Sequence, residues 1–185
     1  MFGVVRRTFA VVEFQKRGLP HVHILLIASE EDRPHNADEY GQHVWAEIPD
    51  PDLNSQLHAA VTSFNIPGPC GPIMPPQQCC VNTPNGVCKW NYPKSFAHEE
   101  SNDGWGFWNY ERRDNGLFAE RSGVHCDGRW VVPCNPICTL RLNCHVNIEV
   151  CSSLKAIKYI FKYIYQGRLK SAACLSAACS KYIIQ

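Results

Sequence analysis

Two histidines separated by one residue, His21 and His23, have a spacing that suits metal chemistry. Residues two apart in a β-strand project from the same face, so both imidazoles can reach one divalent ion. If Gln15 pairs with His21 across a turn, Glu13 lies opposite His23 and adds an oxygen ligand to that face. The alternative is a pair of histidines making ordinary hydrogen bonds at a strand end.

A second constellation is a pair of tyrosines, Tyr159 and Tyr163. In a helix over 154–166 they lie opposite the apolar stripe, so core packing does not account for them. Lys155 and Lys162 lie beside them. A neighbouring cation favours the phenolate that makes tyrosine a nucleophile, and it can also hold a phosphate. The alternative is a solvated face of an amphipathic helix.

Cysteines form the third candidate site. The chain has 11 of them, and Cys70, Cys79 or Cys80, and Cys88 come from a proline-rich stretch. No pair of Cys-x-x-Cys knuckles is present. A zinc site at Cys70, Cys79 and Cys88 is therefore a weaker hypothesis than buried, reduced thiols.

Any contact with nucleic acid must be local, because 18 Lys and Arg against 17 Asp and Glu leave a formal net charge of +1. Arg112 and Arg113, the Lys89–Trp90 pair and the segment Trp105–Trp108 can contact phosphates and stack on bases. The alternative is that these aromatic residues pack a loop onto its domain.

The strands that must position the histidines are readable from the sequence. Apolar, β-branched segments at 8–14 and 21–28 flank a Gly- and Pro-containing turn, which predicts a β-hairpin. The second strand is apolar on both faces after its histidines, so we expect it to lie centrally in a sheet covered by helices.

The rest of the chain is less regular. Most of the 13 prolines fall in 29–120, which reads as an insertion with one weak helix at 53–64. Strict alternation at 145–151 predicts a half-buried strand. No element is predicted in the tail, 168–185.

Composition bounds the class of protein. The chain has 185 residues, of which 45% are hydrophobic and 19% are charged. This length and composition predict one globular domain. The N-terminus lacks the pattern of a secretory signal, and no run of about 18 apolar residues is present. We therefore expect reduced cysteines, no membrane span and an intracellular protein that is not secreted.

The order of these motifs resembles one family. Glu13–Leu26 is similar to the metal-site motif of Helitron Rep domains, which are HUH endonucleases, and Tyr159–Tyr165 resembles their two-tyrosine motif. The resemblance covers residues 8 to 167. Six segments between these two motifs also resemble the family: Ala46–Pro51, Gly68–Gly71, Tyr92–Phe96, Arg112–Gly116, Arg129–Pro133 and Asn143–Glu149.

The resemblance implies an α+β fold: an antiparallel sheet with helices on one face, in a ferredoxin-like HUH core. The single domain, 1–185, would comprise the metal-site hairpin (8–28), a large Pro- and Cys-rich insertion (29–120), a strand and the tyrosine helix (129–167) and a divergent tail (168–185). The family's opening strand is absent from this sequence, so we expect the histidine strand to have an open edge, and the chain to be poorly soluble and at best a slow nickase.

The resemblance also implies an activity. Mg²⁺ or Mn²⁺ held by His21, His23 and Glu13 or Gln15 would serve a single-stranded DNA endonuclease and strand transferase. Tyr159 or Tyr163 would attack and form a 5′-phosphotyrosine, assisted by Lys162, with DNA contacts from Lys155, Arg112 and Arg113. A helicase domain follows in full-length relatives, and the expected location is nuclear or otherwise intracellular.

Two other functions remain open at this point. One is a catalytically inactive DNA- or protein-binding remnant of a transposon. The other is an interaction module stapled by Zn²⁺ on the cysteines. Where the family has a histidine just before Gly-Pro-Cys-Gly, this chain has Pro67, which removes one potential zinc ligand.

Overall fold

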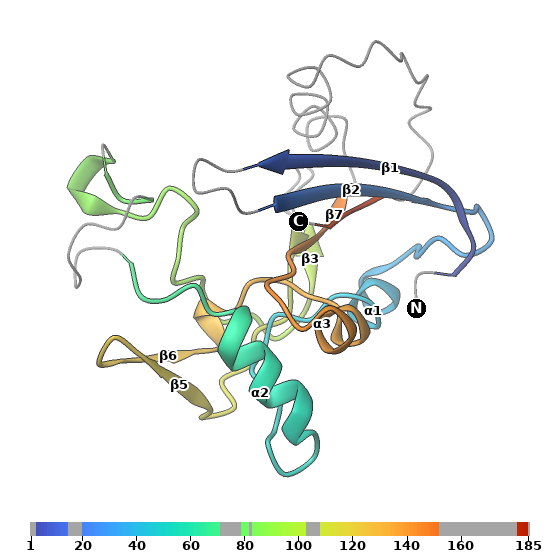
Figure 1. Cartoon of the computed structure of the whole chain (residues 1–185). Coiled ribbons are helices and arrows are strands. Elements are labelled where there is room, and N and C mark those ends of the chain that lie inside the picture. The colour runs from blue at the N-terminus through green and yellow to red at the C-terminus, as the bar shows by residue number, and fades with distance from the viewer. Residues whose placement is uncertain are drawn as a thin grey trace.

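The computed structural model describes residues 3–14, 20–70, 79–81, 83–102, 108–151 and 181–184. Their architecture is mixed α+β, as predicted, with small antiparallel sheets and short helices (Figure 1). The ferredoxin-like arrangement stays a prediction. The elements are β1 (Val5–Phe14), β2 (Pro20–Ala28), α1 (Ala37–Gly41), α2 (Ser55–Phe64), η1 (Pro84–Gly86), β3 (Ser101–Asn102), β4 (Trp108–Asn109), β5 (Phe118–Arg121), β6 (Val124–Asp127), η2 (Gly128–Trp130), α3 (Pro136–Leu142), β7 (Ile148–Cys151) and β8 (Lys181–Ile184).

The predicted hairpin is confirmed, since β1 pairs antiparallel with β2. Its register differs from the expected one. Glu13 lies opposite His21, and Val11 lies opposite His23, so the expectation that Glu13 faces His23 directly is wrong. Because the register differs by two residues, Glu13 and both histidines still share one face of the sheet. Gln15 lies outside the described residues.

The histidine strand is central in a four-stranded sheet ordered β1-β2-β8-β7. β8 lies between β2 and β7 and is antiparallel to both. The expected open edge is therefore wrong for Ile24–Ile27, which pair with β1 on one side and β8 on the other. β8 comes from the tail in which the sequence predicts no element.

One face of this sheet covers a hydrophobic cluster. Val146, Ile148 and Val150 are buried and alternate with less buried neighbours, which confirms the predicted half-buried strand. Their partners come from β2, β4 and β8 and from α1, α3 and neighbouring loops, and the two helices lie under the sheet in Figure 1. The buried and half-buried partners are Tyr40, Val44, Ala46, Tyr110, Leu26, Trp108, Cys138 and Ile184.

A second cluster packs around α2, which matches the weak helix predicted at 53–64. Asn54 caps α2, because its side chain accepts a hydrogen bond from the N–H of Leu57. Asn65 follows the helix and is fully buried. Its side chain donates to the carbonyl of Val146 (3.0 Å) and accepts from the N–H of Val146 (3.2 Å), which ties the second cluster to the sheet.

Within the described part of the chain, no helix is both long and apolar enough to cross a lipid bilayer.

Candidate metal centres

The histidine face of the hairpin brings three of the predicted ligands together. The rings of His21 and His23 are stacked, with centroids 4.6 Å apart and an interplanar angle of 14°. Nε2 of His23 lies 3.4 Å from a carboxylate oxygen of Glu13. Two imidazoles and one carboxylate therefore share one face, although their donor atoms are less compactly grouped than those of the cysteines described below.

Burial differs along this face. His23 is only 2% exposed, His21 is half-buried, and the Glu13 side chain is 47% exposed. Burial, followed by the nearby charge of His23, lowers the pKa of His21 below its ordinary 6.5. A lowered pKa keeps this imidazole neutral at pH 7, with a lone pair available to a metal. The face is thus anchored in the protein interior and opens to solvent at Glu13.

A third imidazole lies near this site and was not among the predicted ligands. Ile24 of β2 and Ile148 of β7 both pair with Ile184, and His21 and His145 each lie three residues before one of these two isoleucines. A charge on His145 also contributes to lowering the pKa of His21. A ring nitrogen of His145 lies 2.9 Å from the carbonyl oxygen of Phe64, so a contact distant in the sequence helps to place this imidazole.

The tyrosine half of the predicted site lies outside the described residues. This applies to Tyr159, Tyr163, Lys162 and Lys155, whose roles stay predictions.

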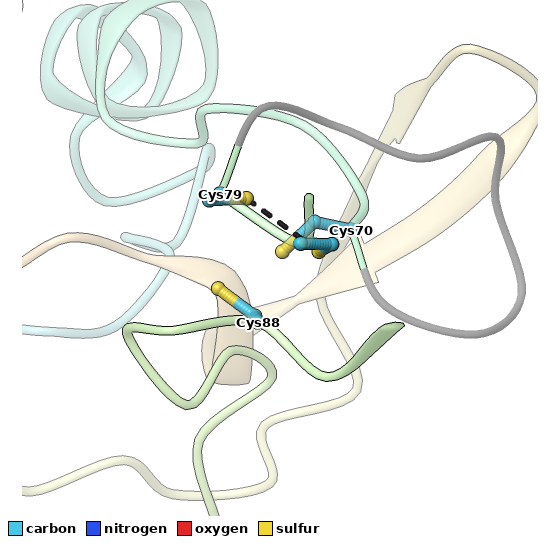
Figure 2. A group of neighbouring side chains, drawn as sticks. Cys70, Cys79 and Cys88 are labelled. Atoms are coloured by element: carbon cyan, nitrogen blue, oxygen red, sulfur yellow. Dashed lines mark hydrogen bonds between the residues drawn. The ribbon is translucent and has the colours of Figure 1, made fainter. Parts of the chain in front are cut away.

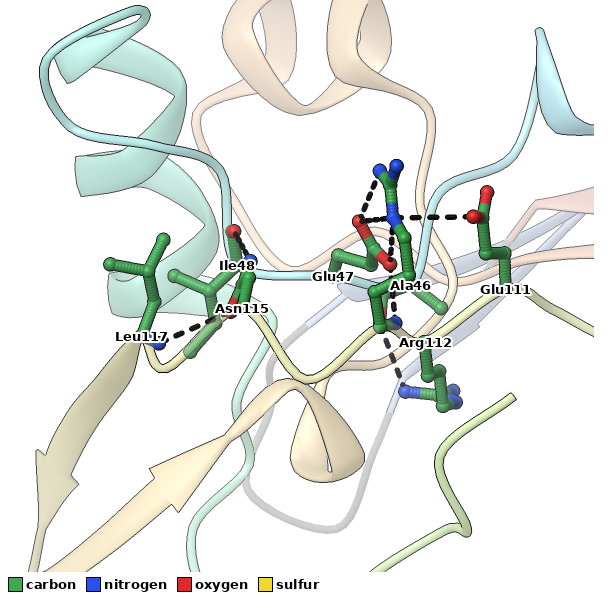
Figure 3. Close-up of polar contacts among 8 residues, drawn as sticks. Ala46, Glu47, Ile48, Glu111, Arg112, Asn115 and Leu117 are labelled. Atoms are coloured by element: carbon green, nitrogen blue, oxygen red, sulfur yellow. Dashed lines mark hydrogen bonds and ion pairs between the residues drawn. The ribbon is translucent and has the colours of Figure 1, made fainter. Parts of the chain in front are cut away.

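The two arginines expected to contact DNA occupy different environments. Arg112 is 4% exposed, and its Nη1 donates to the carbonyl oxygens of Ala46 (3.1 Å), Gly128 (2.8 Å) and Val131 (2.7 Å). Figure 3 shows its side chain directed into the protein beneath the Ala46 segment. A guanidinium in this position joins the segment at Ala46 to η2 and its C-cap, and its burial removes it from a surface that DNA could reach.

Arg113 is exposed, with a side chain that is 60% accessible. It forms a two-pronged ion pair with Glu47 (3.0 and 2.9 Å) and contacts Glu111 at 3.2 Å. Hydrogen bonding to Glu47 raises the pKa of Arg113 above its ordinary value. A phosphate would therefore have to compete with two carboxylates for this guanidinium.

The cysteines form the most compact group of potential ligands in the described residues. The sulfurs of Cys70, Cys79, Cys80 and Cys88 all lie within 4.8 Å of one another. Figure 2 shows Cys70, Cys79 and Cys88 approaching from separate stretches of chain, with their sulfurs turned toward a common space. Such a group could hold a metal ion such as zinc. From the sequence, either Cys79 or Cys80 is expected to join Cys70 and Cys88, whereas in the structure both belong to the group.

The surroundings of the sulfurs differ. Burial is the largest cause that raises the pKa of Cys70 and of Cys79. Burial also acts to raise the pKa of Cys88, but hydrogen bonds from the backbone at Tyr92 and Trp90 outweigh it, and the pKa is lowered. Among Cys70, Cys79 and Cys88, the thiolate is therefore favoured at Cys88.

A family model described as "Helitron helicase-like domain at N-terminus" matches residues 1–26. The matched segment contains β1 and most of β2, including Glu13, His21 and His23. No curated protein matches the chain.

Proposed function

We propose that this chain is a metal-dependent, single-stranded DNA nicking and strand-transfer domain of the Helitron type. The observation that carries the proposal is the convergence of His21, His23 and Glu13 on one face of the hairpin that the family model matches. In relatives of this type a helicase domain acts with the nicking domain, and we propose the same partner here.

The residues on this face fit a divalent cation. Two imidazoles and one carboxylate form a set of three ligands that leaves coordination positions open to solvent and substrate. The half-exposed Glu13 carboxylate adds charge for a hard ion such as Mg²⁺ or Mn²⁺. When bound, such an ion supplies charge stabilisation at the scissile phosphate.

The chain itself supplies the nucleophile in this proposal. The phenolate oxygen of Tyr159 or Tyr163 forms a bond to phosphorus, and the bond from phosphorus to the 3′ oxygen breaks. The 3′ oxygen takes up a proton and leaves as a hydroxyl, while the 5′ phosphate stays on the tyrosine. Lys162 and Lys155 would stabilise the phenolate and hold neighbouring phosphates.

The test is formation of a covalent adduct. The full chain is incubated with 5′- and 3′-labelled single-stranded DNA and Mn²⁺, and the products are separated on a denaturing gel. Label on the 3′ side of the nick is expected to migrate with the protein. His21→Ala and His23→Ala should each lower adduct yield at least tenfold, because each removes a metal ligand. His98→Ala is the matched control, since His98 is an exposed histidine in a loop.

Single substitutions distinguish the roles of the two tyrosines. Tyr159→Phe and Tyr163→Phe should differ in yield if one tyrosine attacks first, and the double variant should form no adduct. If the wild-type chain binds single-stranded DNA yet forms no adduct with Mn²⁺ or Mg²⁺, the nuclease proposal is wrong and a catalytically inactive DNA-binding remnant takes its place.

A further inference from the structure

We propose that Cys70, Cys79, Cys80 and Cys88 bind one structural Zn²⁺ ion as a four-thiolate site, which holds the insertion together independently of the histidine face. Structural zinc sites have four protein ligands and no open position, and their binding energy contributes directly to folding.

The spacing of the sulfurs suits this ion. Tetrahedral zinc with bonds of about 2.3 Å places its sulfurs about 3.8 Å apart. Sγ of Cys79 and Sγ of Cys80 are already 3.7 Å apart, and no pair in the group exceeds 4.8 Å. Closing the widest pair requires a movement of at most about 1 Å, which side-chain rotation can provide.

The backbone around the cysteines brings the two later arms of the site together. The N–H of Lys89 donates to the carbonyl of Cys79 at 3.0 Å, and the N–H of Asn91 donates to the carbonyl of Cys88 at 2.8 Å. Asn91 has a φ of 57°, the left-handed conformation that asparagine tolerates better than most residues. The chain therefore turns sharply just after Cys88 and directs its sulfur toward Cys79.

The location explains why a metal is needed. Cys70, Cys80 and Cys88 are buried in the cluster around α2, where they pack with residues such as Leu57 and Trp130. Among the described residues between 66 and 100, regular structure is limited to the three-residue turn η1. Segments with so little regular secondary structure often rely on disulfides or metal ions for stability.

Four thiolates would not be buried together without a cation, because like charges at these separations repel strongly. A bound Zn²⁺ neutralises part of that charge, and soft sulfur ligands favour zinc over Mg²⁺ or Mn²⁺. The site is therefore chemically distinct from the His21, His23 and Glu13 face, and each can be tested while the other stays intact.

Metal content of the full chain is the first test. The protein is purified without chelators, and zinc is measured by mass spectrometry together with protein concentration. About one zinc per chain is expected. Replacement of zinc by Co²⁺ should produce the strong visible absorption of tetrahedral cobalt and the near-ultraviolet bands of four thiolate ligands. These spectra require only the wild-type chain, so they decide the matter even if cysteine variants do not fold.

Two variants assign the fourth ligand. Cys80→Ser should reduce bound zinc at least tenfold under competition with a chelator, whereas Cys80→His should retain zinc and shift the cobalt bands toward three thiolates and one nitrogen. Cys144→Ser is the matched control, because Cys144 is exposed and outside the group. Full chains lacking zinc and cobalt bands, containing iron instead, or carrying a disulfide among these cysteines would overturn the proposal.

Discussion

The phenolic oxygen of Tyr110 accepts a hydrogen bond of 2.8 Å from the backbone N–H of Val150 and lies 3.1 Å from a carboxylate oxygen of Glu149. Among the strands that the structure describes, β7 is at the edge of its sheet, and this N–H points away from β8. Tyr110 thus occupies the position that a further strand would take. Removing only its hydroxyl tests how much the sheet depends on this contact.

Tyr110→Phe should lower the free energy of unfolding by about 1–3 kcal/mol, because a buried N–H loses its acceptor while the ring still fills its space. Urea denaturation followed by tryptophan fluorescence measures the change. The slope of the free energy of unfolding against urea concentration should stay unchanged, because the folded state stays equally compact. A variant as stable as the wild type would mean that water replaces the hydroxyl at this edge.

Arg112 and Arg113 form a matched pair for testing burial against exposure. Arg112→Met should cost about 3 kcal/mol or more, since three buried carbonyl oxygens lose their donor. Arg113→Met should cost less, about 1 kcal/mol, because the Arg113 side chain is 60% exposed and water can reach its ion pairs. Thermal unfolding of both variants gives the comparison. Equal effects would contradict the assignment of Arg112 to the interior.

Glu100 should make stability depend on pH. Burial, together with the like charges of Glu111 and Asp38, raises its pKa from 4.5 to about 7. The folded protein therefore holds a proton that the unfolded chain releases. This contribution to stability is fully present below about pH 4.5 and is lost as pH rises through about 7.

Glu100→Gln keeps the side chain neutral and should remove the loss of stability that the wild type shows as the pH rises. At pH 8 the variant should be more stable than the wild type by on the order of 1 kcal/mol, after allowance for solvent screening of a half-buried group. The two proteins should converge near pH 5. Chemical denaturation across this range measures both curves, and parallel curves would show that Glu100 titrates normally.

Trp90 is an exposed aromatic side chain that could stack on a base. It is 54% exposed, and Nζ of Lys89 lies 5.0 Å from its ring centroid. If the chain binds single-stranded DNA as proposed, Trp90→Ala should weaken binding by about 1–3 kcal/mol, the usual value of one stacked base. Fluorescence anisotropy with a labelled oligonucleotide measures the affinity. Trp45→Ala provides the control, since Trp45 is also exposed, and equal losses would argue against a specific platform.

Local patterns in the sequence predict the hairpin, α2 and the strand that contains Ile148. The hairpin and the strand follow from short-range properties, namely β-branched runs and strict alternation of apolar residues. The shared face of Glu13, His21 and His23 is also predicted correctly, because a change of register by two residues preserves faces. The residue directly opposite each histidine is not predicted correctly, because the register of a hairpin depends on the geometry of its turn.

Long-range contacts account for what the sequence does not predict. β8 is a four-residue strand whose position depends on pairing with β2 and β7, and its own residues carry little signal. The burial of Arg112 depends on three carbonyls supplied by distant loops. Membership of Cys80 in the cysteine group likewise depends on how the chain turns between Cys79 and Cys88.

The position of β8 between β2 and β7 has a consequence for biosynthesis. Ile27 and Lys181 are paired neighbours in the sheet although roughly 150 residues separate them in the chain. A ribosome adding about 5–20 residues per second needs on the order of ten seconds or more to reach β8 after it has made β2. Throughout that interval the nascent hairpin lacks its β8 partner along Ile24–Ile27. Chaperone contact with the emerging chain should therefore concentrate on this strand and end when residues 181–184 leave the exit tunnel.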